Sequence, residues 1–535
     1  HALQEKGIGL DEALAEAQRC LACDICSDCR ECEIACLPKA IRYDDEDREE
    51  QLRVGAVILA PGGDVYDAGL SEEFGFGRYP NVVTSLQFER LLSAAGPTQG
   101  HIVRSSDGGE PRRIAWLQCI GSRDQEHPYC SAVCCMSATK EAMLAKEHLS
   151  PGADLSIFLM DLRAFGKGFD AYFRRAQDEG VRYVRCRASD LKEVPHSKNL
   201  LLQYENEHGD LVTDEFDMVV LSVGLTAPRG AAELAKAAGV ALDSYGFGAV
   251  SPATPLESSR PGVYVCGTFR GPKDIPDSVT EASGAAGEVQ RVLAAGRGTM
   301  TTPKEFPPEI SLDGEEPRVG VFICHCGSNI AGVVDVAEVA RWAQDLPYVV
   351  YTDHLMFSCS TDSLKTIREA VAQHHLNRVV VASCTPRTHE PLFQENMREA
   401  GLNPYLFEMA NIRDQCSWVH GNLPAEATDK SKRLVAMAVA RACRLEPLHQ
   451  LPQGLGHQAL VVGGGVAGMT AALTLADQGF STVLVERSPR LGGLLLSHDT
   501  LTSGLDSRKL VRELVERVLT NTRIEVLTNC DVVKS

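Results

Sequence analysis

The stretch 459-ALVVGGGVAGMTAALTLADQGFSTVLVE-486 decides the fold of the last part of the chain. Its apolar start predicts a short strand, the glycines predict a tight turn, and the Ala- and Leu-rich run predicts a helix that leads into a second strand. Gly463, Gly465 and Gly468 stand at GxGxxG positions, and Glu486 ends the second strand. This context indicates a dinucleotide-binding βαβ unit in which the acid hydrogen-bonds a ribose hydroxyl.

The residues after the second strand narrow the choice of dinucleotide. The segment 487-RSPRLGGLL-495 resembles the flavoprotein version of the motif, in which a second glycine pair, here Gly492 and Gly493, approaches the pyrophosphate. The motif itself permits NAD as well as FAD, and the resemblance favours FAD. We therefore expect residues 455–535 to form the glycine-motif half of an FAD-binding domain, with Arg487 among the contacts.

Two segments nearer the N-terminus look like the other half of a flavin domain. The first, 57-VILAPGG-63, resembles the strand and glycine turn near a flavin, and the second is 262-GVYVCGTFRGPKDIPDSV-279. In the second, Thr268 stands where many flavoproteins have Asp, so a direct contact to the ribityl chain is in doubt. A helix start in this segment is expected to stabilise a reduced, anionic flavin. The expected cofactor contacts from both segments are Pro61, Gly62, Gly267, Asp277 and Ser278.

Strand and helix patterns alternate along most of the chain, which predicts an α/β fold. The predicted strands lie at 54–63, 113–119, 154–161, 181–186, 217–224, 262–267, 318–324 and 378–384, and an Ala-rich helix is predicted at 428–445. The Pro-, Thr- and charge-rich segment 296–317 has no apolar period and is predicted to be a linker. The expected divisions are 1–50, 51–295, the linker, 318–450 and 455–535.

A dense group of cysteines lies in 119-CIGSRDQEHPYCSAVCC-135. Free cysteines are often small core residues, but an adjacent pair at an apparent helix start weakens that interpretation. The group follows a strand where a nicotinamide-binding domain would carry its glycine-rich turn, and the one glycine here is too few to cradle a pyrophosphate. We expect a metal cluster in place of NAD(P)H, held by Cys119, Cys130, Cys134 and Cys135.

Lys140 lies about one turn after the adjacent cysteine pair. It is a candidate cation for tuning a flavin or its cluster. Most lysines lie on the surface, so an ordinary surface role is at least as compatible with the sequence.

The first cysteine group, in 20-CLACDICSDCRECEIAC-36, is followed by Leu-Pro. Its CxxCxxCxxxC core matches the ferredoxin pattern of iron–sulfur ligands, and a short amphipathic helix at 5–19 introduces it. Zinc is the alternative, because CxxC pairs also build tetrahedral sites. Six thiols exceed what one zinc needs, and they leave open whether one or two clusters are held. The candidate ligands are Cys20, Cys23, Cys26, Cys29, Cys32 and Cys36.

A third group of cysteines is scattered between 320 and 420. Several follow predicted strands, and loops after strands are where open α/β sheets bind ligands, so these thiols can converge although they are far apart in sequence. Cys324 is discounted because its strand is expected to point it away, although it remains a competitor for one ligand position. Ordinary hydrogen-bonded roles are favoured over metal ligation for His325, His389 and His420. The expected ligands are Cys326, Cys359, Cys384 and Cys416.

Composition limits the class of protein. The chain has 535 residues, a formal net charge of −19 and nineteen cysteines. The closely spaced cysteines do not suit a disulfide framework, and no apolar run approaches the length of a membrane span, so we expect a cytoplasmic protein without membrane insertion. The acidic balance argues against binding to nucleic acid, since phosphates attract clustered Lys and Arg.

Several long stretches together resemble the A-type component of heterodisulfide reductase (HdrA) and its bacterial relatives. They include 118-QCIGSRD-124, 130-CSAVCCMSATKEA-142, 160-MDLRAFGKGF-169, 271-GPKDIPDSVTEASGAAG-287, 320-GVFICHCGSNIAGVVDV-336 and 381-VASCTPRTHEPLF-393. The resemblance implies a thioredoxin-reductase-like FAD domain with a ferredoxin-like insert, an unusual cluster on the 119–135 set, and an N-terminal-type domain with its own cluster. The partial Rossmann-type βαβ unit would complete this α/β architecture.

The order of the parts departs from that family. In the family the glycine-motif half precedes the ferredoxin insert, whereas here it comes last. Two explanations fit this order: a segment cut from a tandem A-type chain, or a numbering that hides missing parts. Whether residues 455–535 complete the flavin site of 51–295 is therefore left open.

The resemblance also implies a function. It indicates an electron-transfer oxidoreductase subunit in which FAD exchanges electrons with about three or four 4Fe–4S clusters, with flavin-based electron bifurcation as an implied activity. The alternatives are a non-bifurcating scaffold that feeds a membrane or sulfur- or aromatic-reducing partner, and a structural cluster-binding module without flavin. The implied partners are B- and C-type subunits of the reductase, hydrogenase- or dehydrogenase-type donors and ferredoxin, within a large hetero-oligomeric complex. The donor and acceptor are not specified by the sequence.

Overall fold

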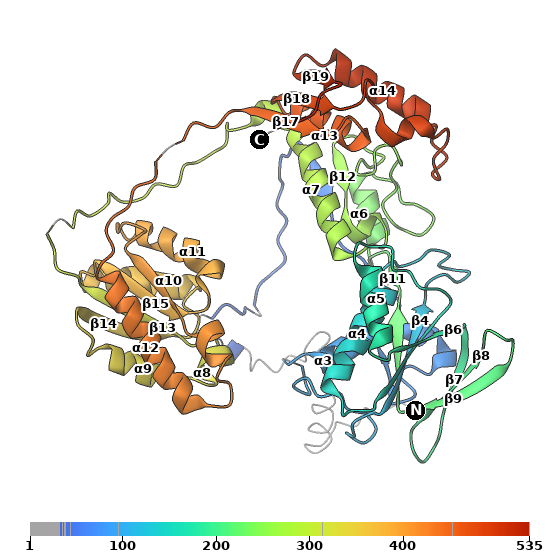
Figure 1. Cartoon of the computed structure of the whole chain (residues 1–535), viewed down its shortest axis with the longest axis horizontal. Helices are drawn as coiled ribbons and strands as arrows, with labels where there is room; N and C mark the ends of the chain where they lie inside the picture. The colour runs from blue at the N-terminus through green and yellow to red at the C-terminus, as the bar shows by residue number, and fades with distance from the viewer. Residues whose placement is uncertain are drawn as a thin grey trace. The chain divides into compact units, whose positions relative to one another are not determined.

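The computed structural model describes residues 33–34, 36, 39–42, 44–94, 96–312, 314–451 and 453–533. These residues belong to two compact units, coloured along the chain in Figure 1. The first unit includes Glu46–Arg297 and His457–Ser535, and the second includes Glu31–Asp45 and Gly298–Gly456. The predicted helix at 5–19 and five ligands of the first cysteine group, Cys20, Cys23, Cys26, Cys29 and Cys32, lie outside the described residues.

A five-stranded parallel sheet, in the order β3-β10-β4-β5-β6, forms the centre of the first unit. Its strands are β3 (Val82–Thr84), β4 (Arg113–Ile120), β5 (Asp154–Leu159), β6 (Arg182–Arg185) and β10 (Met218–Val223). Helices α3 (Ser85–Leu92), α4 (Cys134–His148) and α5 (Phe169–Asp178) cover one face. The other face carries the antiparallel sheet of β7 (Ala188–Glu193), β8 (Leu200–Glu205) and β9 (Leu211–Phe216).

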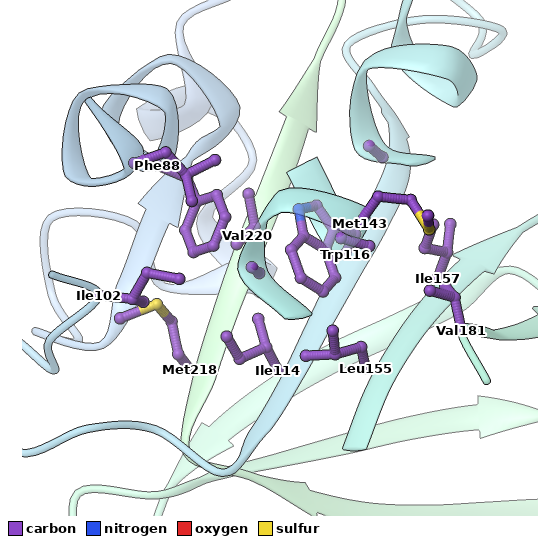
Figure 2. Packing of buried hydrophobic residues seen from close by; sticks show 14 of the residues in the cluster. Phe88, Ile102, Ile114, Trp116, Met143, Leu155, Ile157, Val181, Met218 and Val220 are labelled. Carbon is purple, nitrogen blue, oxygen red and sulfur yellow. The ribbon is translucent and has the colours of Figure 1, made fainter. Parts of the chain in front are cut away.

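Apolar residues at alternate strand positions and on the helices fill the space between the sheet and α3–α5. Figure 2 shows Ile114, Leu155 and Val220 with the larger side chains around them. Trp116 is fully buried and meets Phe88 edge to face, with 5.3 Å between the ring centroids. Buried aromatic pairs of this kind stabilise a core beyond the area that they bury.

A second part of the first unit is built on the parallel pair β1 (Val57–Leu59) and β12 (Val263–Val265). The 3₁₀ turn η3 (Gly267–Arg270) and helix α7 (Ile275–Val292) follow β12, and α6 (Ala231–Ala238) packs on the same strands. A short antiparallel pair, β2 (Asp64–Val65) and β11 (Leu225–Thr226), joins this part to the five-stranded sheet. The carboxyl ends of β1 and β12 therefore lead into the two segments predicted to approach a flavin.

The C-terminal residues form a parallel sheet of β17 (Gln458–Val462), β18 (Ser481–Glu486) and β19 (Ile524–Thr528) with helices α13 (Val466–Asp477) and α14 (Ser507–Thr520). Helix α13 packs against α7 of the same unit (Figure 1). Gln478 donates a hydrogen bond of 3.3 Å to the Gly287 carbonyl, and the Arg297 guanidinium lies 4.6 Å from the centre of the Phe480 ring. The late glycine-motif half thus contacts the early half of the same chain.

The second unit is a doubly wound α/β domain. Its parallel sheet, in the order β14-β13-β15-β16, consists of β13 (Val319–Cys324), β14 (Val349–Leu355), β15 (Arg378–Ser383) and β16 (Phe407–Asn411). Helices α9 (Val336–Ala343) and α12 (Pro424–Ala442) cover one face, and α10 (Thr361–Gln373) and α11 (Pro386–Glu399) cover the other. A four-residue helix, α8 (Ser328–Ala331), follows β13.

The observed elements differ from the predicted ones in two respects. The predicted strand at 54–63 contains only three strand residues, of which Val57 and Ile58 are exposed, because β1 has one strand neighbour and an open face. The three antiparallel strands β7–β9 were not predicted, since their alternating polar residues resemble loop sequence. In the described part of the chain, no helix is both long and apolar enough to cross a membrane.

Candidate functional site

The glycine turn after β17 has the geometry that its sequence predicts. Gly463 has a φ of +107°, which disfavours other residues. A Cβ atom on Gly468 would lie 1.8 Å from the Gly463 carbonyl oxygen, so only glycine allows the first turn of α13 to approach this loop so closely. A Cβ on Gly465 meets nothing within 4 Å, which leaves that position open to a cofactor. The arrangement is that of a pyrophosphate-binding turn.

Glu486 holds the turn from the neighbouring strand. Its carboxylate accepts hydrogen bonds from the Gly464 N–H at 2.6 Å and from the Ser488 N–H at 2.7 Å. These backbone donors, Ser488 first, lower the pKa of Glu486, so the side chain is ionised. It lines a groove of about 680 Å³ together with Gly463, Arg487 and Gly493. Both carboxylate oxygens retain lone pairs for a ribose hydroxyl, so the predicted contact is compatible with this geometry.

The turn after β12 is fixed by a buried ion network. The Lys273 ammonium donates to the carbonyls of Gly267 and Gly271, each at 2.5 Å, and lies 3.4 Å from a carboxylate oxygen of Glu281. Glu281 also accepts the Gly267 N–H at 3.0 Å and forms an ion pair with Arg270. Burial lowers the pKa of Lys273, while Glu281 opposes that shift. The network holds Gly267 in its left-handed conformation at the edge predicted to meet the flavin.

The start of α7 differs in detail from the prediction. The Asp274 side chain caps the helix by accepting the Asp277 N–H at 2.9 Å, and the Ser278 hydroxyl turns back to the Asp274 carbonyl. Asp277 is exposed in the first turn. The remaining N–H groups still give this helix end a partial positive charge. On the β1 side, Gly62 has a φ of +91°, as expected for the turn that includes Pro61.

The four cysteines of the 119–135 set lie around the end of β4 and the start of α4. Cys119 is the last residue but one of β4, Cys130 lies in the loop, and Cys134 and Cys135 open the helix. The segment is strained: Cys119, Arg123 and Ala132 all have φ between +60° and +64°. Each such non-glycine residue costs about 1–2 kcal/mol, and strain of this kind concentrates at functional sites.

The pKa shifts of these thiols show that the four sulfurs interact. Burial raises the pKa of Cys134 above the usual range for a thiol, and Cys119, Cys135 and Cys130 each raise it further. Burial also raises the pKa of Cys135 to about 11, with Cys119 and Cys130 adding to the shift. Thiols with such pKa values are protonated at neutral pH, and metal binding is the usual way to hold them as thiolates.

The structure shows no contact between the Lys140 side chain and the four sulfurs of this set. Its ammonium pairs with the Glu89 carboxylate on α3, and 45% of its side chain is exposed. The predicted role in flavin tuning therefore remains a hypothesis without a supporting contact.

The second unit brings four other thiols together at the carboxyl ends of its strands. Burial raises the pKa of Cys359, and Cys324, Cys384 and Cys326 raise it further. Burial raises the pKa of Cys384 as well, and the nearby Arg413 guanidinium lowers it. Arg413 also donates to the Cys326 sulfur at 3.7 Å. The interacting set in this unit is therefore Cys324, Cys326, Cys359 and Cys384.

This set has Cys324 in place of Cys416 and otherwise matches the predicted one. Cys416 is fully buried in a π-helical turn, and its thiol contacts the Ala427 carbonyl at 3.1 Å and the Ser431 hydroxyl at 3.3 Å, both on α12. Cys324 was expected to point away, yet its sulfur accepts the Ser358 N–H at 3.4 Å beside Cys359. Strand alternation does not predict this pairing, because β13 ends at Cys324 and Cys326 lies beyond it with a φ of +49°.

The histidines of this region have ordinary partners. His325 Nε2 lies 2.9 Å from Nδ1 of His354, and His420 Nε2 lies 3.3 Å from the Lys430 ammonium. Among the described residues, no three His, Cys, Asp or Glu side chains are placed to hold one metal ion. A 4Fe–4S cluster makes a different demand, because its thiolates bind separate iron atoms and stand farther apart. The chemistry of the two donor sets, each with four thiols, fits a cluster.

Similar proteins bear on the fold of the chain and on its last segment. Residues 458–531 match the model of the FAD-dependent oxidoreductase family. The predicted α/β fold with an FAD-binding unit, and the prediction of an oxidoreductase, are confirmed. The chain is also similar to a solved structure, thioredoxin reductase from T. acidophilum, with 18% identity, a TM-score of 0.30, and coverage of 44% of this chain and 64% of that one.

Curated relatives extend the similarity beyond the flavin segment. The chain is 45% identical over 280 residues to the A-type iron–sulfur component of the CoB–CoM heterodisulfide reductase of Methanocaldococcus jannaschii, which covers 51% of this chain and 42% of that protein. It is 37% identical over 306 residues to the A-type component of the H₂:CoB–CoM heterodisulfide, ferredoxin reductase of Methanothermobacter thermautotrophicus. That match covers 56% of this chain and 45% of that protein. The chain thus spans less than half the length of these relatives. Over the matched half of the chain, the predicted resemblance to the A-type component of heterodisulfide reductase is confirmed.

Proposed function

We propose that this chain is a flavin and iron–sulfur electron-transfer subunit of a heterodisulfide-reductase-type complex. One observation carries the proposal: the first unit combines an FAD-family segment, packed on α7, with four interacting thiols at the end of β4. When bound, FAD exchanges electrons in pairs or singly, and a 4Fe–4S cluster carries them singly.

The two halves of the flavin site have separate tasks. Gly463 and Gly465 leave the backbone open for a pyrophosphate, and Gly468 lets α13 approach the turn closely. Glu486 fixes the turn and offers lone pairs to a ribose. Lys273 and Glu281 hold the turn at Gly267 on the other side. Because α13 contacts α7 within one unit, residues 457–533 are the half that completes the flavin site of this chain.

Cluster binding is assigned to the two interacting thiol sets. In the first unit Cys119, Cys130, Cys134 and Cys135 serve as ligands, and in the second unit Cys324, Cys326, Cys359 and Cys384 do so. The described residue Cys36 belongs to the ferredoxin-like group, whose other cysteines lie outside the described residues. With that group, the chain would hold about three or four clusters.

Partners are inferred from the relatives. The name of the relative from Methanothermobacter thermautotrophicus includes H₂, ferredoxin and a CoB–CoM heterodisulfide. By analogy, this chain exchanges electrons with a hydrogenase- or dehydrogenase-type donor, with ferredoxin and with B- and C-type subunits. Flavin-based bifurcation is the finer form of this proposal. It predicts that the holo-complex reduces a low-potential ferredoxin only while a high-potential acceptor is also present.

The test of the flavin site uses two glycine variants of the full chain. Gly468→Ala places a Cβ against the Gly463 carbonyl oxygen, so we expect bound FAD to fall at least tenfold, as measured by flavin absorbance per chain. Gly456→Ala is the matched control, since its Cβ meets nothing within 4 Å. Absence of flavin from the anaerobically purified wild type would favour a structural cluster-binding module. Flavin and clusters without coupled ferredoxin reduction would favour the non-bifurcating scaffold.

A further inference from the structure

A group of three charged residues lies beside the four thiols of the first unit. Asp161, two residues after β5, accepts two hydrogen bonds from each of two arginines. Arg123 donates from Nη1 and Nη2 at 2.6 and 3.1 Å, and Arg163 donates from Nε and Nη2 at 3.0 and 3.2 Å. Double forks between guanidinium and carboxylate are among the strongest charge-assisted contacts in proteins. We call Arg123, Asp161 and Arg163 the clamp.

Each residue of the clamp interacts with the thiol set. The Arg123 guanidinium lies beside the Cys119 sulfur and lowers the pKa of that thiol against the larger effect of burial. The Asp161 carbonyl lies 3.9 Å from the Cys135 sulfur, which also receives a backbone hydrogen bond from Arg163. The charge of Arg163 interacts with Cys130 as well. The clamp therefore lies beside Cys119 through the Arg123 side chain and beside Cys135 through its backbone.

The backbone of Arg123 is strained at the point where its side chain meets Asp161 and Cys119. Arg123 has a φ of +60°, which costs about 1–2 kcal/mol for a side chain of this kind. The two bidentate pairs with Asp161 offset part of this cost, since such charge-assisted forks are stronger than ordinary surface pairs. Only 21% of the Arg123 side chain is exposed, against 45% for Arg163. The strained conformation directs the less exposed guanidinium at Cys119.

We propose that the clamp sets the reduction potential of the cluster held by the four thiols of the first unit. The inference rests on the proposed function. Four thiolates make the site anionic, and reduction adds one further negative charge, so a nearby cation favours the reduced state and a nearby anion opposes it. Arg123 and Arg163 raise the potential, and the Asp161 carboxylate lowers it while it orients both guanidinium groups. The clamp residues are positioning residues that contact the ligands.

The test compares substitutions that change the charge of the clamp in opposite directions. In the full-length holoprotein, an anaerobic redox titration is followed by electron paramagnetic resonance, and the signal missing from Cys134→Ala identifies the cluster. We expect Arg123→Gln to shift its potential to a more negative value and Asp161→Asn to a more positive one, while Arg123→Lys stays near the wild type. Arg174→Gln, which breaks an exposed pair with Asp170 on α5, is the control and should leave the potential unchanged.

Several results would overturn the proposal. One is an unchanged reduction potential in Arg123→Gln when iron is retained. Another is a shift of the reduction potential with the same sign in Arg123→Gln and Asp161→Asn. If Arg123→Gln loses iron, Arg163→Gln carries the same test, with a smaller negative shift expected from its greater exposure. Loss of iron from all three variants with an unchanged circular dichroism spectrum would show that the clamp only holds the loop. Failure of the proposed function is distinct, since a wild type without a reducible cluster signal would reveal it first.

Discussion

The two interacting thiol sets of this chain are brought together by different parts of the structure. In the first unit the four cysteines lie within 119–135, in one strand end, one loop and one helix start. In the second unit they are spread over 324–384 and meet because β13, β14 and β15 are parallel and end at one edge of the sheet. The first set depends on local backbone geometry, and the second depends on the topology of a whole domain.

The surroundings of the two sets share one feature and differ in another. Each has an arginine at a sulfur: Arg123 lies beside Cys119, and Arg413 donates to Cys326. In the first unit the cysteines themselves begin helix α4, which has no side-chain cap. In the second unit Cys359 precedes a helix that is capped by Ser360. In the first unit the positions of the thiols therefore depend on the local backbone and the clamp. In the second unit they depend on the fold of the whole domain.

The sharpest way to test this comparison is to substitute Cys324 and Cys416 one at a time. Cys324→Ala should remove one cluster, about four iron atoms per chain, because Cys324 interacts electrostatically with Cys359 and Cys384. Cys416→Ala should keep all the iron and lower the free energy of unfolding by about 1–2 kcal/mol, since its thiol only contacts α12. Iron content per chain distinguishes the two variants.

The comparison would fail if Cys416→Ala lost iron and Cys324→Ala kept it. Cys443→Ala serves as a control in the same unit, because Cys443 follows the end of α12 and is absent from the interacting set. It should retain both iron and flavin.

The first set could be read from the sequence because its members are close together. Spacing alone grouped Cys119, Cys130, Cys134 and Cys135, and the structure places them so that their charges interact. The second set could be predicted only in outline, as cysteines after strands. The choice between Cys324 and Cys416 depended on the left-handed φ of +49° at Cys326 and on the π-helical turn that buries Cys416, neither of which leaves a residue pattern.

The fold was predictable to a similar degree. The apolar strands of the parallel sheets and the glycine turn followed from periodicity, and β4, β5, β10 and β15 lie where they were expected. The antiparallel sheet of β7–β9 could not be predicted from periodicity, because charged residues occupy many alternate positions of its strands. The clamp was also missed, since Arg123 and Asp161 are 38 residues apart and only the pairing of β4 with β5 brings them together.

A second prediction concerns the helix that supports the first set. Glu141 on α4 is fully buried, accepting the Trp116 indole N–H at 2.8 Å, and burial raises its pKa to about 8 from the ordinary 4.5. Because the folded chain binds this proton more tightly, the free energy of unfolding falls by about 1.4 kcal/mol per pH unit between about 4.5 and 8. Glu141→Gln removes that loss and keeps the acceptor. It should stabilise the chain by about 3 kcal/mol at pH 7.

Unfolding midpoints measured from pH 4.5 to pH 8.5 check this expectation. The gain of Glu141→Gln should shrink to near zero at the acid end, where the wild-type carboxyl is protonated in both states. Glu147→Gln, on an exposed turn of the same helix, should show no such pH dependence. A gain that is constant with pH would mean that Glu141 is not protonated in the folded chain.

The smallest expected effect comes from the cap of α10. It tests whether the thiols of the second unit are positioned by the whole domain or by this one helix. The Ser360 hydroxyl accepts the Ser363 N–H at 3.3 Å and caps α10 directly after Cys359. Ser360→Ala should lower the free energy of unfolding by about 1 kcal/mol, the usual loss for a helix cap, while iron content stays unchanged. Ser363→Ala keeps the capping oxygen and the backbone N–H that it accepts, and removes only the hydroxyl that accepts from Ser360 at 3.1 Å, so its effect should be smaller. Loss of iron from Ser360→Ala alone would show that the second set, like the first, depends on local helix geometry, and the contrast between the two sites would disappear.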